Sequence, residues 1–140
     1  MENLAKAANS SASGIAVIYN NTVLLAKRNE ICYITGRPNV YGGYWSILGG
    51  SIDKGETPKE CAVRELEEET GICLDIKNVK FLKKIPEKKK DFFIHYCNVN
   101  SMPLVRLNEE HTEYGYFEIN SLHNFPYLID DKIAQAIQEI

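Results

Sequence analysis

The segment 49–72 constrains the fold most, because it contains a helix whose two ends are both marked in the sequence. Thr57 is a favoured N-cap residue, Pro58 suits the first helical position, and Glu60 completes a capping box. Gly71 stands where many helices end in a left-handed backbone conformation. These signals predict a helix of about thirteen residues, about 20 Å long.

The predicted helix carries a cluster of glutamates towards its C-terminal end. At about 100° per residue, Glu65, Glu68 and Glu69 lie within an arc of about 100° beside the apolar face. Like charges at these spacings repel, and acidic groups in the last turn oppose the helix dipole. A solvated charged face is one interpretation. The other is a bound divalent cation, which would relieve both penalties, and all-oxygen ligands favour Mg²⁺ or Mn²⁺.

A glycine pair precedes this helix. The stretch 44–48 is typical of a short strand, which we expect to end at a turn formed by Gly49 and Gly50. Backbone without side chains can come close to a ligand. A Mg²⁺ site normally completes its octahedron with waters and substrate phosphate oxygens, so a phosphate-bearing substrate is predicted.

The remaining pattern predicts further strands and a closing helix. The range 14–27 is typical of a hairpin that turns at Asn20-Asn21. The mixed order of strands and helices predicts an α/β domain. The other predicted elements are a second hairpin from strands over 79–85 and 91–99, a strand over 114–119 and an amphipathic helix over 130–140.

Composition limits the partners. The 140 residues suffice for one domain, which we place over 13–140 after a flexible segment over 1–12. A net charge of −3 provides no general attraction for nucleic acid or for an anionic membrane. The four cysteines form no CxxC pair, which argues against a zinc site and a disulfide framework. No apolar run has the length of a signal peptide or a membrane span, so we expect a cytoplasmic protein, as a monomer or homodimer.

The spacing of the glycines and acids forms a longer motif. Gly50 is followed after five residues by Glu56, and after seven more by the run RELEEETGI over 64–72. This motif resembles the signature of the Nudix (MutT-like) hydrolases without a mismatch. The motif over 50–72 is called the box, and the helix within it the box helix. The resemblance implies a Nudix-type α/β/α sandwich with a mixed β-sheet, the box helix and a C-terminal helix. It also implies an enzyme that cleaves a pyrophosphate bond.

The resemblance implies a metal site. Glu68 and Glu69 would be the main metal ligands, the carbonyl of Gly49 would contribute, and Glu56 would support the same cluster. One departure is Leu48, where many relatives have proline immediately before the glycine pair. The departure changes no metal ligand, but it makes the loop less rigid.

The resemblance also implies catalytic roles. Glu65 would activate the attacking water or bind metal, and Arg64 would orient Glu65 through a charge-assisted hydrogen bond. Glu68 would act beside them as a catalytic metal ligand. Bound metals lower the pKa of water and neutralise charge on the bridging phosphates, so the protein mainly positions water for attack at phosphorus.

Three charged residues outside the motif are further candidates. Arg28 ends a predicted strand at a position that contacts substrate phosphate in related nucleoside triphosphate hydrolases; a surface arginine is the alternative. The segment 109–117 resembles one that precedes a late strand in small Nudix enzymes. This makes Glu110 an additional metal ligand or alternative base, with Glu113 in reserve. A solvated acidic loop is the alternative for both.

Aromatic residues before the motif are candidates for contact with a base. Tyr33, Tyr41, Tyr44 and Trp45 lie in or beside this loop, and packing within the core or loop is their alternative. We select Tyr44 and Trp45 as substrate-binding residues, together with Gly50 and Arg28.

The substrate is less constrained. Lysines over 83–90 could steer phosphate, or could form a solvated hairpin tip. Ile129 stands where relatives that hydrolyse 8-oxo-guanine nucleotides carry a base-reading asparagine, and Pro86 lacks the spacing expected of the ADP-ribose class. We therefore expect a small-molecule nucleotide, either a nucleoside triphosphate or a dinucleoside polyphosphate.

Three other functions remain as alternatives. An ADP-ribose or nucleotide-sugar pyrophosphatase would use the same motif on another substrate. A catalytically inactive nucleotide-binding module is disfavoured, because such modules lose carboxylates that this chain keeps. An α/β domain with a merely solvated acidic helix is the third.

Overall fold

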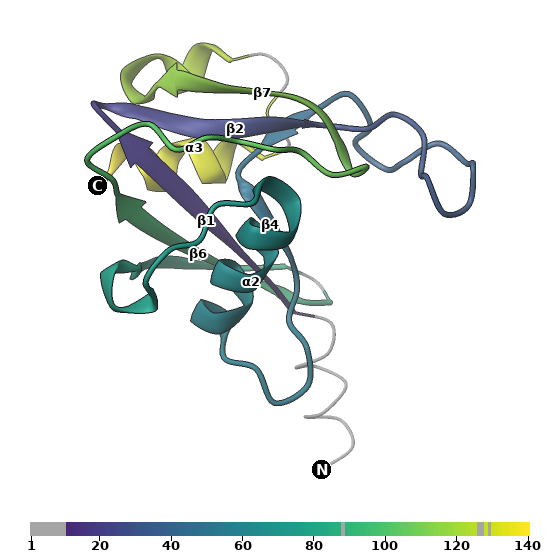
Figure 1. The fold of residues 1–140 in the computed structure, drawn as a ribbon, viewed down its shortest axis with the longest axis horizontal. Helices are drawn as coiled ribbons and strands as arrows, with labels where there is room; N and C mark the ends of the chain where they lie inside the picture. Colours follow the sequence, from purple (N-terminus) through teal and green to yellow (C-terminus); the bar gives the residue numbers. More distant parts are fainter. Residues whose placement is uncertain (1–10, 88, 126–127, 129) are drawn as a thin grey trace.

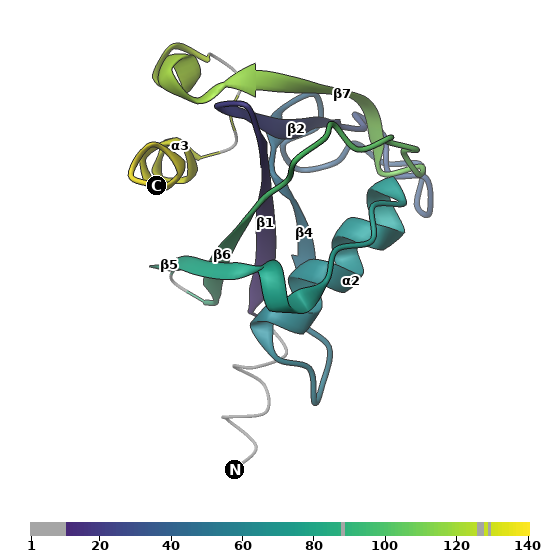
Figure 2. The same ribbon diagram turned by 60° about the vertical axis from the view of Figure 1, so that its left-hand side comes forward.

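The computed structural model describes residues 11–87, 89–125, 128 and 130–140. A mixed β-sheet lies between helix α2 on one face and helix α3 on the other, which confirms the predicted α/β/α architecture (Figures 1 and 2). The strands are β1 (Ala12–Tyr19), β2 (Thr22–Arg28), β3 (Trp45–Ser46), β4 (Leu48–Ser51), β5 (Lys80–Pro86), β6 (Asp91–Asn98) and β7 (His111–Glu118). The helices are α2 (Pro58–Thr70), α3 (Asp131–Gln138) and the 3₁₀ helices η1 (Ile76–Asn78) and η2 (Ile119–Asn124).

Strand β1 organises the sheet. It pairs in parallel with β6 over residues 12–18, and antiparallel with both β4 and β2 on its other edge. The first half of β1 contacts β4, and only its last two residues contact β2. The sheet therefore forks beside β1, with β4 on one branch and β2, β3 and β7 on the other.

Local sequence signals explain the first hairpin and the box helix. Asn20 and Asn21 have positive φ angles of 47° and 62°, as a tight hairpin turn requires. The Thr57 side chain accepts from the N–H of Glu60, whose carboxylate accepts from the N–H of Thr57. Gly71 ends α2 at φ 77°, so the predicted bounds of this helix are confirmed.

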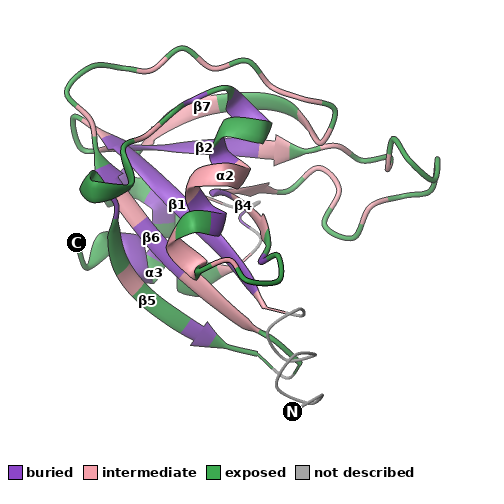
Figure 3. Cartoon of the chain, turned by 60° about the horizontal axis from the view of Figure 1, so that its bottom comes forward, coloured by how far each residue is buried: buried purple, intermediate pink, exposed green. Residues whose placement is uncertain are grey.

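Two apolar layers hold the helices against the sheet. Ala62 and Leu66 of α2 are fully buried against the face that carries Ile15 and Val17 of β1. The opposite layer packs α3 on residues that include Ile94 of β6. Burial follows this arrangement, with β1 buried along most of its length and β5 largely exposed at the edge (Figure 3).

The expected strand over 44–48 is wrong in its extent. The chain pairs first with β2 through β3, and after Ile47 it moves to β1 through β4. Gly49 and Gly50 continue β4 and form no turn, because their missing side chains leave space for the neighbours on both sides. The error arose because glycine signals a turn in sequence, whereas here it permits close packing.

Other expected boundaries shift by a few residues. The second hairpin is confirmed as β5 and β6, and the late strand begins at His111, three residues before its expected start. Ala12 is buried in β1, although the expected flexible segment included it; residues 1–10 lie outside the described residues, as does Ile129. No helix in the described ranges is long and apolar enough to cross a membrane.

The segment 29–44 forms an exposed loop between β2 and β3 (Figure 3). Its two ends are hydrogen-bonded: the N–H of Arg28 donates to the carbonyl of Tyr44, and the N–H of Gly43 donates to the carbonyl of Arg28, both at 2.8 Å. Ile31 and Pro38 bridge further out. The loop is therefore closed at its base.

Candidate active site

The glycine pair in β4 positions two carboxylates of α2. The backbone N–H of Gly49 donates to Oε1 of Glu69 at 3.1 Å. A Cβ on Gly50 would lie 2.5 Å from the carboxylate carbon of Glu65, so this carboxylate packs directly on the glycine. A Cβ on Gly49 would lie 2.3 Å from the carbonyl oxygen of Ser13 in β1. The two glycines thus fit α2 and β1 against β4.

This contact predicts different effects for two matched substitutions. Gly50→Ala must displace the Glu65 carboxylate, which is the end of a flexible side chain, so we expect kcat to fall about tenfold with a small change in Tm. Gly49→Ala meets the backbone of β1, so we expect a large fall in Tm. Turnover and melting curves for both variants test this, and wild-type kcat in Gly50→Ala would contradict the role of Glu65.

Glu69 lies in a small cluster with Glu110 and His111. One ligand atom from each of these residues lies within 4.8 Å of the other two. Glu69 is 2% exposed, whereas the other two are partly exposed. The structure thus brings the predicted ligands Glu69 and Glu110 together, although Glu69 is on α2 and Glu110 lies in the turn immediately before β7.

Burial changes the protonation of this cluster. Burial, and next the adjoining carboxyl of Glu110, raise the pKa of Glu69 to about 10. Burial also raises the pKa of Glu65, against the lowering effect of Arg64. Burial lowers the pKa of His111, which favours the neutral imidazole. Raised carboxyl pKa values indicate a site that favours added positive charge.

Arg64 connects four acidic side chains at the edge of the site. Its Nε donates to Glu56 at 2.7 Å and a terminal nitrogen donates to the other Glu56 oxygen at 3.0 Å. Its other terminal nitrogen donates to Glu65 and to Glu68, both at 3.1 Å. The terminal nitrogen that donates to Glu56 also lies 3.4 Å from a carboxylate oxygen of Asp53. The predicted contact between Arg64 and Glu65 is therefore present, and Arg64 is more than an exposed helix partner.

The remaining motif acids lie around Arg64. Glu56 forms a bidentate ion pair with Arg64, and hydrogen bonding to that guanidinium lowers the pKa of Glu56. Glu68 has a side chain 55% exposed and contacts Arg64 at the solvent edge. Metal ligation by Glu56 and Glu68 stays a prediction, as does a contribution of the Gly49 carbonyl.

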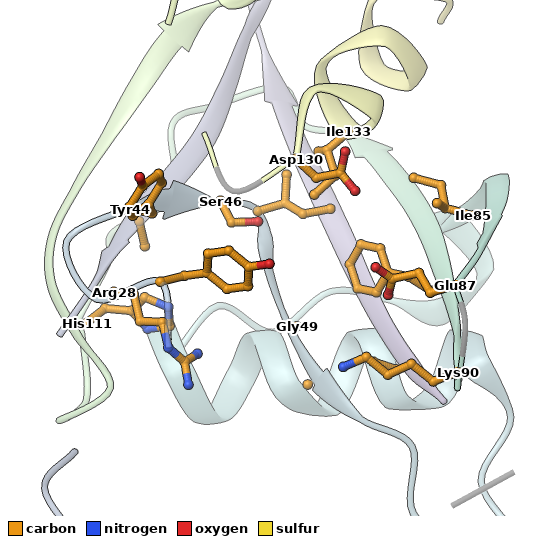
Figure 4. A pocket seen from close by; sticks show the side chains of 16 residues that line it. Arg28, Tyr44, Ser46, Gly49, Ile85, Glu87, Lys90, His111, Asp130 and Ile133 are labelled. Atoms are coloured by element: carbon orange, nitrogen blue, oxygen red, sulfur yellow. The ribbon is translucent and has the colours of Figure 1, made fainter. Parts of the chain in front are cut away.

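A pocket of about 360 Å³ opens beside the glycine pair (Figure 4). Arg28 and Lys90 reach into it from opposite sides, Glu87 lies on the same side as Lys90, and Asp130 lies at the top in this view. The pocket is therefore lined by both cationic and acidic side chains. Its lining also includes Tyr41, Tyr44, Gly49, Gly50 and His111.

The predicted substrate residues separate into two groups. Arg28, Tyr44 and Gly50 line the pocket. Trp45 lies in an aromatic cluster, with its ring centroid 5.3 Å from that of Phe117, and the described lining of the pocket does not include it. The reserve residue Glu113 pairs instead with Lys27 at 3.3 Å on the surface.

Several pocket residues were not selected from the sequence. His111 follows Glu110 directly, and this adjacency was a signal that could have identified it. Lys90 was grouped only with the hairpin lysines, and Tyr41 only with the loop aromatics. Tyr41 has a positive φ of 61°, which is unusual for a residue with a side chain, and its ring lies 6.0 Å from that of Tyr44.

One thiol contacts the site: Sγ of Cys61 donates to the carbonyl of Gly50 at 3.5 Å and accepts from Arg64 at 3.8 Å. All four cysteines are free, with Cys61 and Cys97 buried and Cys73 exposed. Burial raises the pKa of Cys61 to about 12, so its thiol is unreactive at neutral pH.

The sequence profile of the NUDIX domain matches residues 9–138, which is most of the chain. The chain belongs to the NUDIX domain family. This membership confirms the family resemblance that the motif over 50–72 indicated.

Curated relatives resemble parts of this NUDIX domain. RNA pyrophosphohydrolase of Erythrobacter litoralis is 43% identical over 58 residues, which are 41% of this chain and 35% of that protein. ADP-ribose pyrophosphatase of Methanocaldococcus jannaschii is 32% identical over 65 residues, 46% of this chain and 38% of that protein. The matches thus span little more than a third of these relatives' length.

Solved structures show the same fold. A MutT structure from work on Aliivibrio salmonicida and Vibrio cholerae has a TM-score of 0.70 and 22% identity, and the match covers 93% of this NUDIX domain chain and 98% of that one. Identity at this level supports the shared fold alone.

Proposed function

We propose that this chain is a metal-dependent hydrolase that cleaves a pyrophosphate bond in a nucleoside diphosphate linked to another group. A nucleoside triphosphate or a dinucleoside polyphosphate is the proposed substrate. One observation carries this proposal: the carboxylates of Glu65 and Glu69 reach β4 at the glycine pair, and the same glycines line a pocket that contains Arg28.

The donor set fits Mg²⁺ or Mn²⁺. Carboxylate oxygens are the ligands that these ions prefer, and Glu69 and Glu110 are close enough to share one ion. A cation there would also stabilise the charged form of Glu69, which burial disfavours in the metal-free chain. When bound, the ions lower the pKa of water and neutralise phosphate charge. Glu68 at the solvent edge and Glu56 would complete the acidic site.

The protein side chains supply the remaining functions. Glu65 is held by Arg64 and packed on Gly50, and it would accept a proton from the attacking water. Arg28 would bind phosphate, and Tyr44 with Tyr41 would contact the base. A pocket of about 360 Å³ suits a nucleoside, so a further group of a larger substrate would extend into solvent.

A phosphate-release screen tests the reaction. Its arms are nucleoside triphosphates, dinucleoside polyphosphates, ADP-ribose, nucleotide sugars and RNA with a 5′-triphosphate, each with Mg²⁺, with Mn²⁺ and with a chelator. We expect metal-dependent release from the first two classes. Nucleotide binding without turnover in any arm would favour the inactive module. An unchanged Tm on addition of either ion would favour the solvated helix.

The place of Arg28 in the pocket predicts that its substitution weakens substrate binding. Arg28→Ala removes a cation from the pocket, so we expect KM to rise about tenfold and the metal-induced change in Tm to persist. The control is Arg37→Ala, which removes an exposed guanidinium from the adjoining loop. Equal kinetics for the two variants would remove Arg28 from the substrate site.

A further inference from the structure

We propose that His111 supplies a nitrogen ligand to a divalent cation held with Glu69 and Glu110, and that this ligand favours a first-row transition ion such as Mn²⁺ over Mg²⁺. The inference rests on the metal dependence proposed above and adds a ligand of a different chemical kind. A motif made of carboxylates alone does not predict it.

Geometry places the imidazole with the two carboxylates. One ring nitrogen of His111 lies within 4.8 Å of ligand oxygens of both Glu69 and Glu110, although the three residues come from two distant parts of the chain. An ion at the centre of such a triangle would lie about 2 to 3 Å from each atom after small side-chain adjustments. His111 begins β7, where pairing with Arg28 of β2 fixes its backbone.

An unpartnered polar atom supports the same site. Nδ1 of His111 is buried and has no hydrogen-bond partner, the single such side-chain atom in the described part of the chain. A buried polar atom without a partner destabilises a fold unless another contact compensates. Coordination of the cation by Nδ1 itself would provide such a contact.

The chemistry of nitrogen ligands determines the selectivity. Mg²⁺ is a hard ion that retains oxygen ligands and waters, whereas first-row transition ions bind imidazole more readily. Among first-row divalent ions, Mn²⁺ binds a given set of ligands most weakly. A site that still binds Mn²⁺ more tightly than Mg²⁺ would therefore be strong support for a nitrogen ligand. Two carboxylates and one imidazole also leave positions open for water and phosphate.

The test measures ion binding without substrate. The dissociation constants of Mn²⁺ and Mg²⁺ are determined by calorimetry, and pulsed EPR of bound Mn²⁺ detects coupling to nitrogen. We expect nitrogen coupling in the wild type, and its loss in His111→Gln together with a rise of about tenfold in the Mn²⁺ constant. The Mg²⁺ constant should change less than about twofold. The control His123→Gln alters an exposed histidine of η2 and should retain wild-type values.

Several results would overturn the inference. One is wild-type protein that binds Mn²⁺ without nitrogen coupling, or does not bind it at all. Equal weakening of both ions in His111→Gln is another, because it would indicate a general disturbance of the site. If that variant fails to fold, wild-type protein labelled with ¹⁵N-histidine still decides the question, since a histidine ligand must change the coupling pattern.

The two proposals fail separately. Absence of turnover in the substrate screen leaves the nitrogen signature and the ratio of dissociation constants measurable. Conversely, metal-dependent turnover in a protein whose bound Mn²⁺ has only oxygen ligands would support the proposed function and reject the role of His111.

Discussion

Replacing Glu69 by glutamine is expected to lower kcat about a hundredfold or more, and to raise the Tm of the metal-free protein. Turnover falls because glutamine removes an anionic oxygen ligand from the cluster with Glu110. The opposite effect on stability follows from the raised pKa of Glu69, about 10 in the folded chain against an ordinary 4.5. The acid stabilises the fold fully below pH 4.5, and its contribution declines as pH rises towards the folded pKa.

Glutamine has no proton to lose, so the variant lacks this decline. At neutral pH we expect metal-free Glu69→Gln to melt above the wild type, and we expect saturating Mg²⁺ to reverse the order because only the wild type binds the ion well. Melting curves between pH 5 and 9, with Mg²⁺ and with a chelator, measure both effects. Glu67→Gln, on the exposed face of the same helix, is the matched control. A wild-type kcat in Glu69→Gln would exclude Glu69 as a metal ligand.

Arg64→Lys is expected to lower kcat about tenfold or more, even though it keeps the positive charge. The guanidinium of Arg64 uses one edge for both oxygens of Glu56 and its other terminal nitrogen for Glu65 and Glu68. An ammonium group is a single point and cannot make these contacts together. Glu65 would then lose the orientation that its proposed role requires.

The melting temperatures of two Arg64 variants distinguish a role in orienting Glu65 from a role in pairing charge. Arg64→Ala leaves Glu56 without its guanidinium, so we expect a lower Tm than in Arg64→Lys. Because Arg64 lowers the pKa of Glu56, the stabilising contribution is present above the ordinary pKa of 4.5 and is lost as pH falls through the folded value. We therefore expect the difference in Tm between wild type and Arg64→Ala to shrink in acid. Measurement of kcat, KM and Tm for both variants decides: wild-type kcat in Arg64→Lys would make Arg64 a structural residue only.

Sequence was sufficient where the determining contacts are local. The ends of α2 were predicted because Thr57, Pro58, Glu60 and Gly71 act within one helical turn of each end. The first hairpin was predicted for the same reason, since its turn depends on two adjacent asparagines with positive φ. The motif also identified Glu69, whose place on the buried side of α2 follows from helical periodicity.

Sequence was insufficient where the contacts join distant segments. The extension of β4 through Gly49 depends on close packing against Ser13, which is 36 positions away and gives no local signal. The neighbours of His111 come from α2 and β2, so its place beside Glu69 depends on the completed sheet. Trp45 shows the same limit, because an aromatic ring beside a loop can equally face ligand or core, and here it packs on Phe117.

The closed base of the loop between β2 and β3 isolates the proposed reacting centre from changes in the length of that loop. Hydrogen bonds between Arg28 and its partners Gly43 and Tyr44 fix the distance between the loop ends, whatever the number of residues beyond them. Chain length there has a small energetic effect, since doubling a loop costs only about 0.6 kcal/mol. Insertions or deletions over 32–37 would therefore leave the glycine pair and its carboxylates in place. Evolution or engineering can lengthen, shorten or recruit this loop for new substrates while the reacting centre stays unchanged.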